Sequence, residues 1–274
     1  MKSIAILTAA LLLFVFVLRP ARKRARRARL RAQPFPPAWS EVLARNLPIF
    51  EHLPVGLQSQ LQGHMQVFLG EKRFVGCEGL QVTDAMRVTI AAQACLLLLN
   101  RETSIYSGLS TIYLYPTAYV ATARTHAGAG AEQVSRSVRL GESWTRGSVV
   151  LSWSHSRSGA ANFDDGINVV LHEFAHQLDQ EDGDADGAPQ LETPSCYRTW
   201  AAVLGSEFKR VQDRRAGLKL KSLINDYGAT NPAEFFAVAT ENFYEKPVQL
   251  KRKHPELYAE LAKYYRVNPG DWKP

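Results

Sequence analysis

The segment that decides the fold reads Asn168-Val169-Val170-Leu171-His172-Glu173-Phe174-Ala175-His176-Gln177-Leu178-Asp179, and it contains the pattern H-E-x-x-H. Residues four apart lie on one face of a helix, so His172 and His176 can reach the same metal ion. Glu173 would then face a water molecule bound to that ion and could take its proton. The pattern predicts a helix with two zinc-binding histidines and a catalytic carboxylate.

A surface helix could also carry these residues by chance, since roughly one chain in a hundred of this length contains such a five-residue match. The surrounding residues argue against chance. The apolar residues recur at spacings of three and four, which predicts a helix packed into a core. Polar side chains on such a helix are costly unless something binds them. The context therefore favours a metal site. The apolar residues of the pattern are Leu171, Phe174, Ala175 and Leu178.

The third protein ligand of a zinc hydrolase is expected outside this segment. The residues after His176 do not continue into H-E-x-x-H-x-x-G-x-x-H. They form an acidic, glycine-containing turn without the ligand spacing of a calcium-binding EF-hand loop. This turn is interpreted as a solvated loop.

A later helix over residues 231–243 is the best source of the third ligand. Asn231 is a good N-cap, and Pro232 suits the first helical position. Glu234 would lie in the first turn, where it could bind the metal or only complete a capping box. Glu241 lies seven residues further on nearly the same face and is the competing ligand. The spacing favours Glu234 but leaves both open.

The chain also resembles a known family, through six blocks that occur in the family's order from about Trp39 almost to the C-terminus. Together the blocks are far more specific than H-E-x-x-H alone. The resemblance is to the Mlc titration factor A family of bacterial zinc-dependent peptidases. The blocks are residues 74–88, 90–98, 140–144, 147–153, 172–179 and 226–238.

The resemblance implies a zinc peptidase with named site residues. It implies His172, His176 and Glu234 as ligands of Zn²⁺ and Glu173 as the catalytic carboxylate. It also suggests Tyr227 as a stabiliser of the transition state, although Tyr227 could instead be a turn aromatic packed on the following helix. The expected function is hydrolysis of a peptide or protein substrate. The alternative is a regulatory protein that sequesters a transcriptional regulator, as the family's name implies.

The expected fold is an α+β zincin-like metallopeptidase domain over residues 39–274, with an active-site helix and an adjacent edge strand. The alternating Val149, Leu151 and Trp153 predict a strand over Gly147–Trp153, just before the helix. In zincin-like folds, an edge strand at this place aligns an extended substrate by main-chain pairing. An ordinary core strand is the other interpretation.

The N-terminus carries an uncharged apolar run, Ile4–Leu18, followed at once by eight basic residues. A cleaved signal peptide would end in an A-x-A-like site, and none follows the run. The prediction is a transmembrane anchor over residues 1–18, then a basic juxtamembrane segment and Pro-rich linker over residues 19–38.

The charge after the apolar run predicts orientation and partners. The positive-inside rule would place the domain on the cytoplasmic side of a bacterial inner membrane, with the basic segment on anionic lipid headgroups. A soluble cytoplasmic protein is the alternative. Without Lys2 and these eight residues, 24 basic residues face 26 acidic ones, so the net charge of +7 belongs to the N-terminus. A domain that binds nucleic acid would carry positive charge on its folded surface, so direct nucleic-acid binding is not expected.

Overall fold

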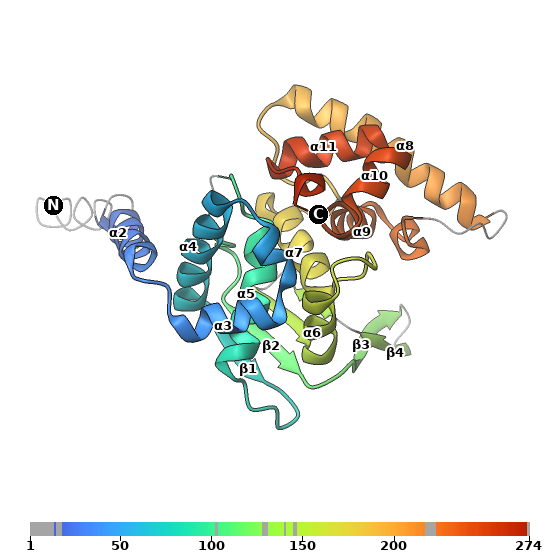
Figure 1. Ribbon diagram of the computed structural model, residues 1–274. Coiled ribbons are helices and arrows are strands. Elements are labelled where there is room, and N and C mark those ends of the chain that lie inside the picture. The colour runs from blue at the N-terminus through green and yellow to red at the C-terminus, as the bar shows by residue number, and fades with distance from the viewer. Residues whose placement is uncertain are drawn as a thin grey trace, which may run out of the picture.

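The centre of the fold is a four-stranded sheet with strand order β1-β2-β6-β5 (Figure 1). The computed structural model describes residue 14 and residues 18–101, 104–127, 131–139, 141–144, 147–216 and 223–272. Strands β1, β2 and β6 are parallel, and β5 is antiparallel to β6. The strands are β1 (Arg73–Gly76), β2 (Thr111–Tyr115), β5 (Gly141–Trp144) and β6 (Ser148–Ser152).

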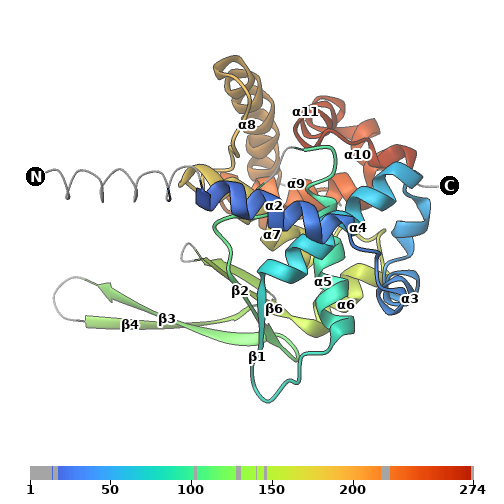
Figure 2. The same ribbon diagram turned by 90° about the vertical axis from the view of Figure 1, so that its left-hand side faces the viewer.

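One face of this sheet packs against the hydrophobic core. Ile112 and Leu114 of β2 pair in register with Val149 and Leu151 of β6, and all four side chains are fully buried. Because successive side chains of a strand point to opposite faces, these four lie on the same face. The helices gather on this sheet as a first layer (Figures 1 and 2). They are α3 (Pro37–Asn46), α4 (Val55–Glu71), α5 (Asp84–Leu96), α6 (Trp153–Ala161) and α7 (Val169–Asp179).

The C-terminal helices form a second layer beside α7. Helix α9 packs along α7, and α8, α10 and α11 pack around α9. These helices are α8 (Pro194–Ala216), α9 (Pro232–Glu245), α10 (Pro247–Lys253) and α11 (Pro255–Tyr265). Short 3-10 helices occur at Pro48–His52, Gln180–Asp182, Asp226–Ala229 and Pro269–Asp271.

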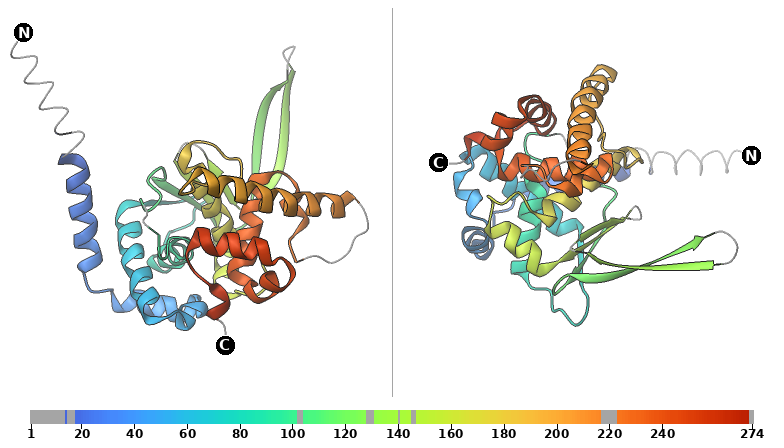
Figure 3. Two further views of the ribbon diagram at one scale, coloured as in Figure 1. Left: turned by 90° about the horizontal axis from the view of Figure 1, so that it is seen from above. Right: turned by 90° about the vertical axis from the view of Figure 1, so that its right-hand side faces the viewer.

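A two-stranded hairpin extends from the sheet between β2 and β5. Its strands, β3 (Tyr119–Ala127) and β4 (Ala131–Arg139), are antiparallel, with Tyr119 opposite Arg139. Figures 2 and 3 show this hairpin projecting well beyond the helices. The hairpin returns the chain to the sheet so that β5 runs antiparallel to β6.

The basic N-terminal segment forms helix α2 (Arg19–Ala32), which lies along α4 (Figure 3). The Arg27 guanidinium donates two hydrogen bonds to the Glu71 carboxylate, at 2.8 and 2.6 Å, and one to the Ser104 carbonyl at 2.6 Å. The Arg27 and Glu71 side chains are only 12% and 10% exposed, so this paired arrangement is stronger than an ordinary surface ion pair.

The predicted fold class is wrong in two respects. The domain is mixed α/β rather than α+β, because α5 lies between β1 and β2 in the chain and carries it across to a parallel strand. Within the described ranges, no helix is both long and apolar enough to span a membrane, so the structure does not support the predicted anchor helix. The predicted anchor, residues 1–18, lies outside the described residues apart from Phe14 and Leu18.

The predicted edge strand also needs correction. The segment Gly147–Trp153 does form a strand, β6, but this strand lies inside the sheet between β2 and β5. The strand ends at Ser152, whose hydroxyl accepts the His155 N–H and caps the start of α6. The edge beside α7 is β5, and α7 packs against both β5 and β6.

Candidate metal centre

Helix α7 is fixed in the core by its apolar face and by its N-cap. The side chain of Asn168 accepts hydrogen bonds from the N–H groups of Val170 and Leu171, at 3.1 and 3.0 Å. This satisfies two of the donors that every helix leaves free at its start. The four apolar residues predicted to face the core are all buried, so this prediction is confirmed.

Three potential ligand atoms from two helices meet at one point. The His172 and His176 Nε2 atoms lie 3.3 Å apart. The Glu234 Oε2 lies 3.0 Å from the first and 3.5 Å from the second. Among the described residues, these three form the group whose ligand atoms all lie within 4.8 Å of one another and could hold a metal ion. The two histidines and the favoured glutamate are therefore brought together.

The first turn of α9 places Glu234. The Asn231 side chain accepts the Glu234 N–H at 2.9 Å, and Pro232 follows it at the first helical position. The N-cap expected from the sequence is thus present. It leaves the Glu234 carboxylate facing α7 instead of closing a capping box.

Glu241 lies near this group but contacts the other side of a histidine ring. Its Oε1 accepts from His172 Nδ1 at 2.7 Å, and its Oε2 accepts from the Asn168 N–H at 2.6 Å. The two carboxylates therefore contact opposite nitrogens of the His172 ring, Glu234 at Nε2 and Glu241 at Nδ1. Since the Glu241 carboxylate can only accept, it would fix the Nδ1–H tautomer of a neutral His172 and so leave Nε2 for a metal ion.

The electrostatics of the group favour a cation. Burial alone would lower the pKa of His172, but hydrogen bonds to Glu234 and Glu241 outweigh burial and raise it well above its usual value. Burial would raise the pKa of Glu234, yet its hydrogen bonds to His172 and His176 hold it far below the usual range. Two imidazole nitrogens and an ionised carboxylate are ligands that suit Zn²⁺, so these residues fit a zinc ion.

The two remaining predicted residues flank the group. Glu173 is 5% exposed and follows His172 directly on α7, close enough for its charge to act on that imidazole. Tyr227 lies in the 3-10 helix before α9, with its ring centroid 5.9 Å from that of His172. The Tyr227 side chain is 54% exposed, so a phenol beside the metal group is open to solvent.

The acidic segment after His176 is a solvated turn only in its later part, because Asp179 still belongs to α7 and is fully buried. Asp182, Asp184 and Asp186 are exposed. The Asp182 and Asp186 carboxylates accept N–H groups of their own turn, from Asp184 and Ala188.

Glu245 is a site residue that the sequence analysis missed. Its carboxylate is fully buried and accepts the N–H groups of Gly166 and Ile167, at 2.8 and 3.0 Å, and the Asn168 side-chain amide at 3.1 Å. Glu241 and Glu245, four residues apart on α9, thus hold the chain where α7 begins. The only sequence signal was their helical spacing.

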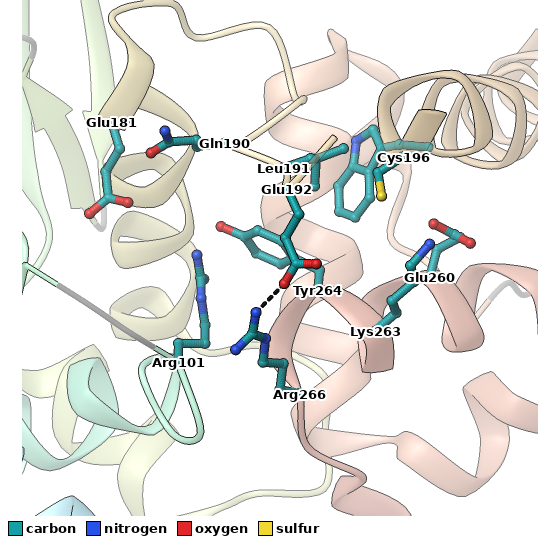
Figure 4. A pocket seen from close by; sticks show the side chains of 11 residues that line it. Arg101, Glu181, Gln190, Leu191, Glu192, Cys196, Glu260, Lys263, Tyr264 and Arg266 are labelled. Atoms are coloured by element: carbon teal, nitrogen blue, oxygen red, sulfur yellow. Dashed lines mark hydrogen bonds and ion pairs between the residues drawn. The ribbon is translucent and has the colours of Figure 1, made fainter. Parts of the chain in front are cut away.

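A cavity of about 560 Å³ lies elsewhere, beyond the C-terminal end of α7 (Figure 4). It is lined by residues of the 3-10 helix at Gln180–Asp182, of α8 and of α11, and none of the predicted site residues lines it. Its three basic side chains, Arg101, Lys263 and Arg266, are balanced by three glutamates. Trp200 also borders it.

The buried carboxyl of Glu245 predicts a pH dependence of stability. Burial raises the pKa of Glu245 from 4.5 to about 8. The folded protein therefore binds a proton that the unfolded chain releases, and this contribution, complete below about pH 4.5, is lost as the pH rises to about 8. In metal-free protein, the unfolding free energy of Glu245→Gln relative to wild type should rise across this window, by up to about 1.4 kcal/mol per pH unit. Urea unfolding at a series of pH values measures this difference, and a difference that stays constant would contradict the assignment.

Comparison with known proteins agrees with this geometry. The family model "Glucose-regulated metallo-peptidase M90" matches residues 21–266. An uncharacterized protein of Synechocystis, slr2042, is 39% identical over 245 residues, which cover 89% of each chain. A protein named Mlc titration factor A from Klebsiella pneumoniae is 32% identical, over 84% of this chain and 86% of its own. A second protein of that name, from Escherichia fergusonii, is 30% identical over 85% of this chain.

The match over most of the chain and the identities to these relatives confirm the resemblance drawn from the sequence blocks. A metallopeptidase family implies a bound metal, and the two histidines of α7 with Glu234 of α9 are a group able to hold one. The chain belongs to the M90 family of metallopeptidases, and proteins named Mlc titration factor A are among its relatives.

Proposed function

We propose that this protein is a zinc-dependent peptidase whose metal is held by His172, His176 and Glu234. The observation that supports this most strongly is the meeting of three ligand atoms from α7 and α9, in a chain of a metallopeptidase family. A structural zinc site usually has four protein ligands, whereas a catalytic site has three and keeps one position for water. Three ligands beside Glu173 therefore fit catalysis.

The proposed chemistry divides between the metal and the side chains. Zinc, when bound, supplies a Lewis acid that polarises a peptide carbonyl and lowers the pKa of a bound water. Glu173 acts as general base on the attacking water and then returns the proton to the leaving amine. The phenol of Tyr227 donates a hydrogen bond to the oxygen on which negative charge develops.

The sheet supplies a place for an extended substrate. Strand β5 forms the edge beside α7, and its outer side has no partner strand among the described residues. Backbone pairing along this edge would align a peptide next to the helix that carries His172 and Glu173. This assigns to β5 the alignment that the sequence analysis expected from β6.

A second candidate function is binding of a transcriptional regulator. The relatives named Mlc titration factor A favour it, since the name describes a factor that titrates Mlc. The two functions can coexist on one chain. A binding protein has no need of a carboxylate next to the metal ligands, however, so the retained Glu173 favours hydrolysis as the primary activity.

Substitution of Glu173 separates hydrolysis from binding. Glu173→Gln keeps the size of the side chain but removes the base, so peptide hydrolysis should fall by about 10²–10⁴-fold. Zinc content should stay at the wild-type value. Cleavage of a broad peptide library, together with metal analysis, measures both. Full hydrolysis by this variant would contradict the role of Glu173, and an inactive wild type with bound zinc would favour the binding function.

Substitution of Glu241 tests whether this residue orients His172. Glu241→Gln weakens the hydrogen bond that orients His172, and the variant should bind zinc about 10–100-fold more weakly than wild type. Glu256→Gln, an exposed change on α11, is the matched control and should bind zinc normally. Competition with a zinc chelator gives the affinities. Equal affinities of Glu241→Gln and the control would show that Glu241 does not orient the ligand.

A further inference from the structure

A tight turn after α7 is held from both sides. Gly187 lies in this turn with φ of +79°, a conformation that glycine adopts without strain. Its N–H donates to the Asp179 carboxylate at 3.0 Å, and its carbonyl accepts from the Trp200 indole N–H at 2.9 Å. Asp179 is the last residue of α7, and Trp200 belongs to α8. One glycine thus connects the helix of the two histidines to α8.

The same glycine lies directly against the start of α9. A β-carbon at Gly187 would stand 2.4 Å from the carbonyl oxygen of Pro232 and 3.1 Å from the nitrogen of Ala233. Real β-carbons do not approach other atoms so closely, so no residue with a side chain fits here unless α9 moves. Pro232 begins α9, and Glu234 follows two residues later. The position of Gly187 therefore limits where the third proposed ligand can lie.

The two residues that hold Gly187 are buried. Asp179 is fully buried, and Trp200 is 2% exposed. Burial of a carboxyl is costly unless hydrogen bonds compensate. The Gly187 N–H is the partner of Asp179 Oδ2, whereas Asp179 Oδ1 has no hydrogen-bond partner among the described residues. Asp179 also lies three residues after His176, so it extends the face of α7 that carries a histidine. Trp200 also lines the cavity of about 560 Å³.

The turn complements the carboxylates at the other end of the helix pair. Glu241 and Glu245 fasten the later part of α9 to the start of α7. Gly187, which is hydrogen-bonded to Asp179 at the end of α7, packs directly against the start of α9. The two helices run antiparallel, with hydrogen bonds between them at one end, close packing at the other, and the candidate metal group between the two.

We propose that Asp179 and Trp200 are positioning residues for Glu234. Their hydrogen bonds hold Gly187 in contact with Pro232, and this contact sets the distance between α9 and the histidines of α7. The inference rests on the proposed function, in which Glu234 binds zinc. Neither residue belongs to the group of three proposed ligands. Loss of either hydrogen bond should displace Glu234 and so weaken zinc binding. The expected loss of affinity is about 10–100-fold, as for other groups that orient metal ligands.

The decisive test compares two glycines of the same loop. Gly187→Ala introduces both an unfavourable φ and a collision with Pro232. Gly183→Ala introduces the unfavourable φ alone, since Gly183 has φ of +106° and no atom within 4 Å of its β-carbon position. Zinc affinity by chelator competition should fall about 10–100-fold in Gly187→Ala and stay near wild type in Gly183→Ala. Equal affinities of the two variants would overturn the proposal.

Substitution of Asp179 gives an independent check in case Gly187→Ala does not fold. Asp179→Ala removes the acceptor of the Gly187 N–H, whereas Asp179→Asn keeps an oxygen in its place. Zinc affinity should fall in Asp179→Ala and be restored toward wild type in Asp179→Asn. A role of Asp179 in packing alone would leave zinc affinity unchanged in both variants, which would overturn the proposal.

A metal-free readout separates this inference from the proposed function. Amide hydrogen exchange at the first turn of α9 should become faster in zinc-free Gly187→Ala and Asp179→Ala, while exchange at its last turn stays unchanged. A wild-type chain that binds no zinc would contradict the proposed function. Unchanged exchange at the first turn in both variants would contradict the positioning role.

Discussion

The structure of the site depends on the packing of α9 against α7, through groups that are buried and polar. Burial of carboxylates and imidazoles is unfavourable unless each finds a partner. Here the partners lie on the opposite helix: Glu234 and Glu241 meet His172, and Glu245 meets the N–H groups before α7. The position of α9 along α7 is therefore restricted, because a shift of one residue along α9 would rotate these carboxylates by about 100° away from their partners.

This packing explains why the sequence predicted only part of the site. A helix period places His172 and His176 together, and an N-cap places Glu234 at a helix start, so both could be inferred locally. The choice between Glu234 and Glu241 depended on how far α9 is shifted along α7, which no local pattern contains. Glu245 and Gly187 act through contacts with distant segments, and these contacts exist only in the folded chain.

The sheet shows the same limit. Alternating apolar residues correctly predicted a strand over Gly147–Trp153, but the place of a strand in a sheet depends on pairing between distant segments. The hairpin β3–β4 brings β5 to the edge and leaves β6 inside. The fold class was wrong for a related reason, since the parallel pairing of β1 and β2 follows from the crossover through α5. The basic segment, predicted to lie next to a membrane, forms a helix that contacts α4 through the ion pair of Arg27 with Glu71.

If α7 and α9 bind zinc together, the metal content and the X-ray absorption spectrum of the purified protein will show it. One zinc ion per chain is expected, with two imidazole nitrogens and carboxylate oxygen among its nearest neighbours. His176→Ala should abolish stoichiometric binding, and Glu234→Gln should lose the carboxylate from the spectrum. A chain that contains no zinc, or zinc whose spectrum is the same in wild type and both variants, would show that these two helices do not bind zinc together.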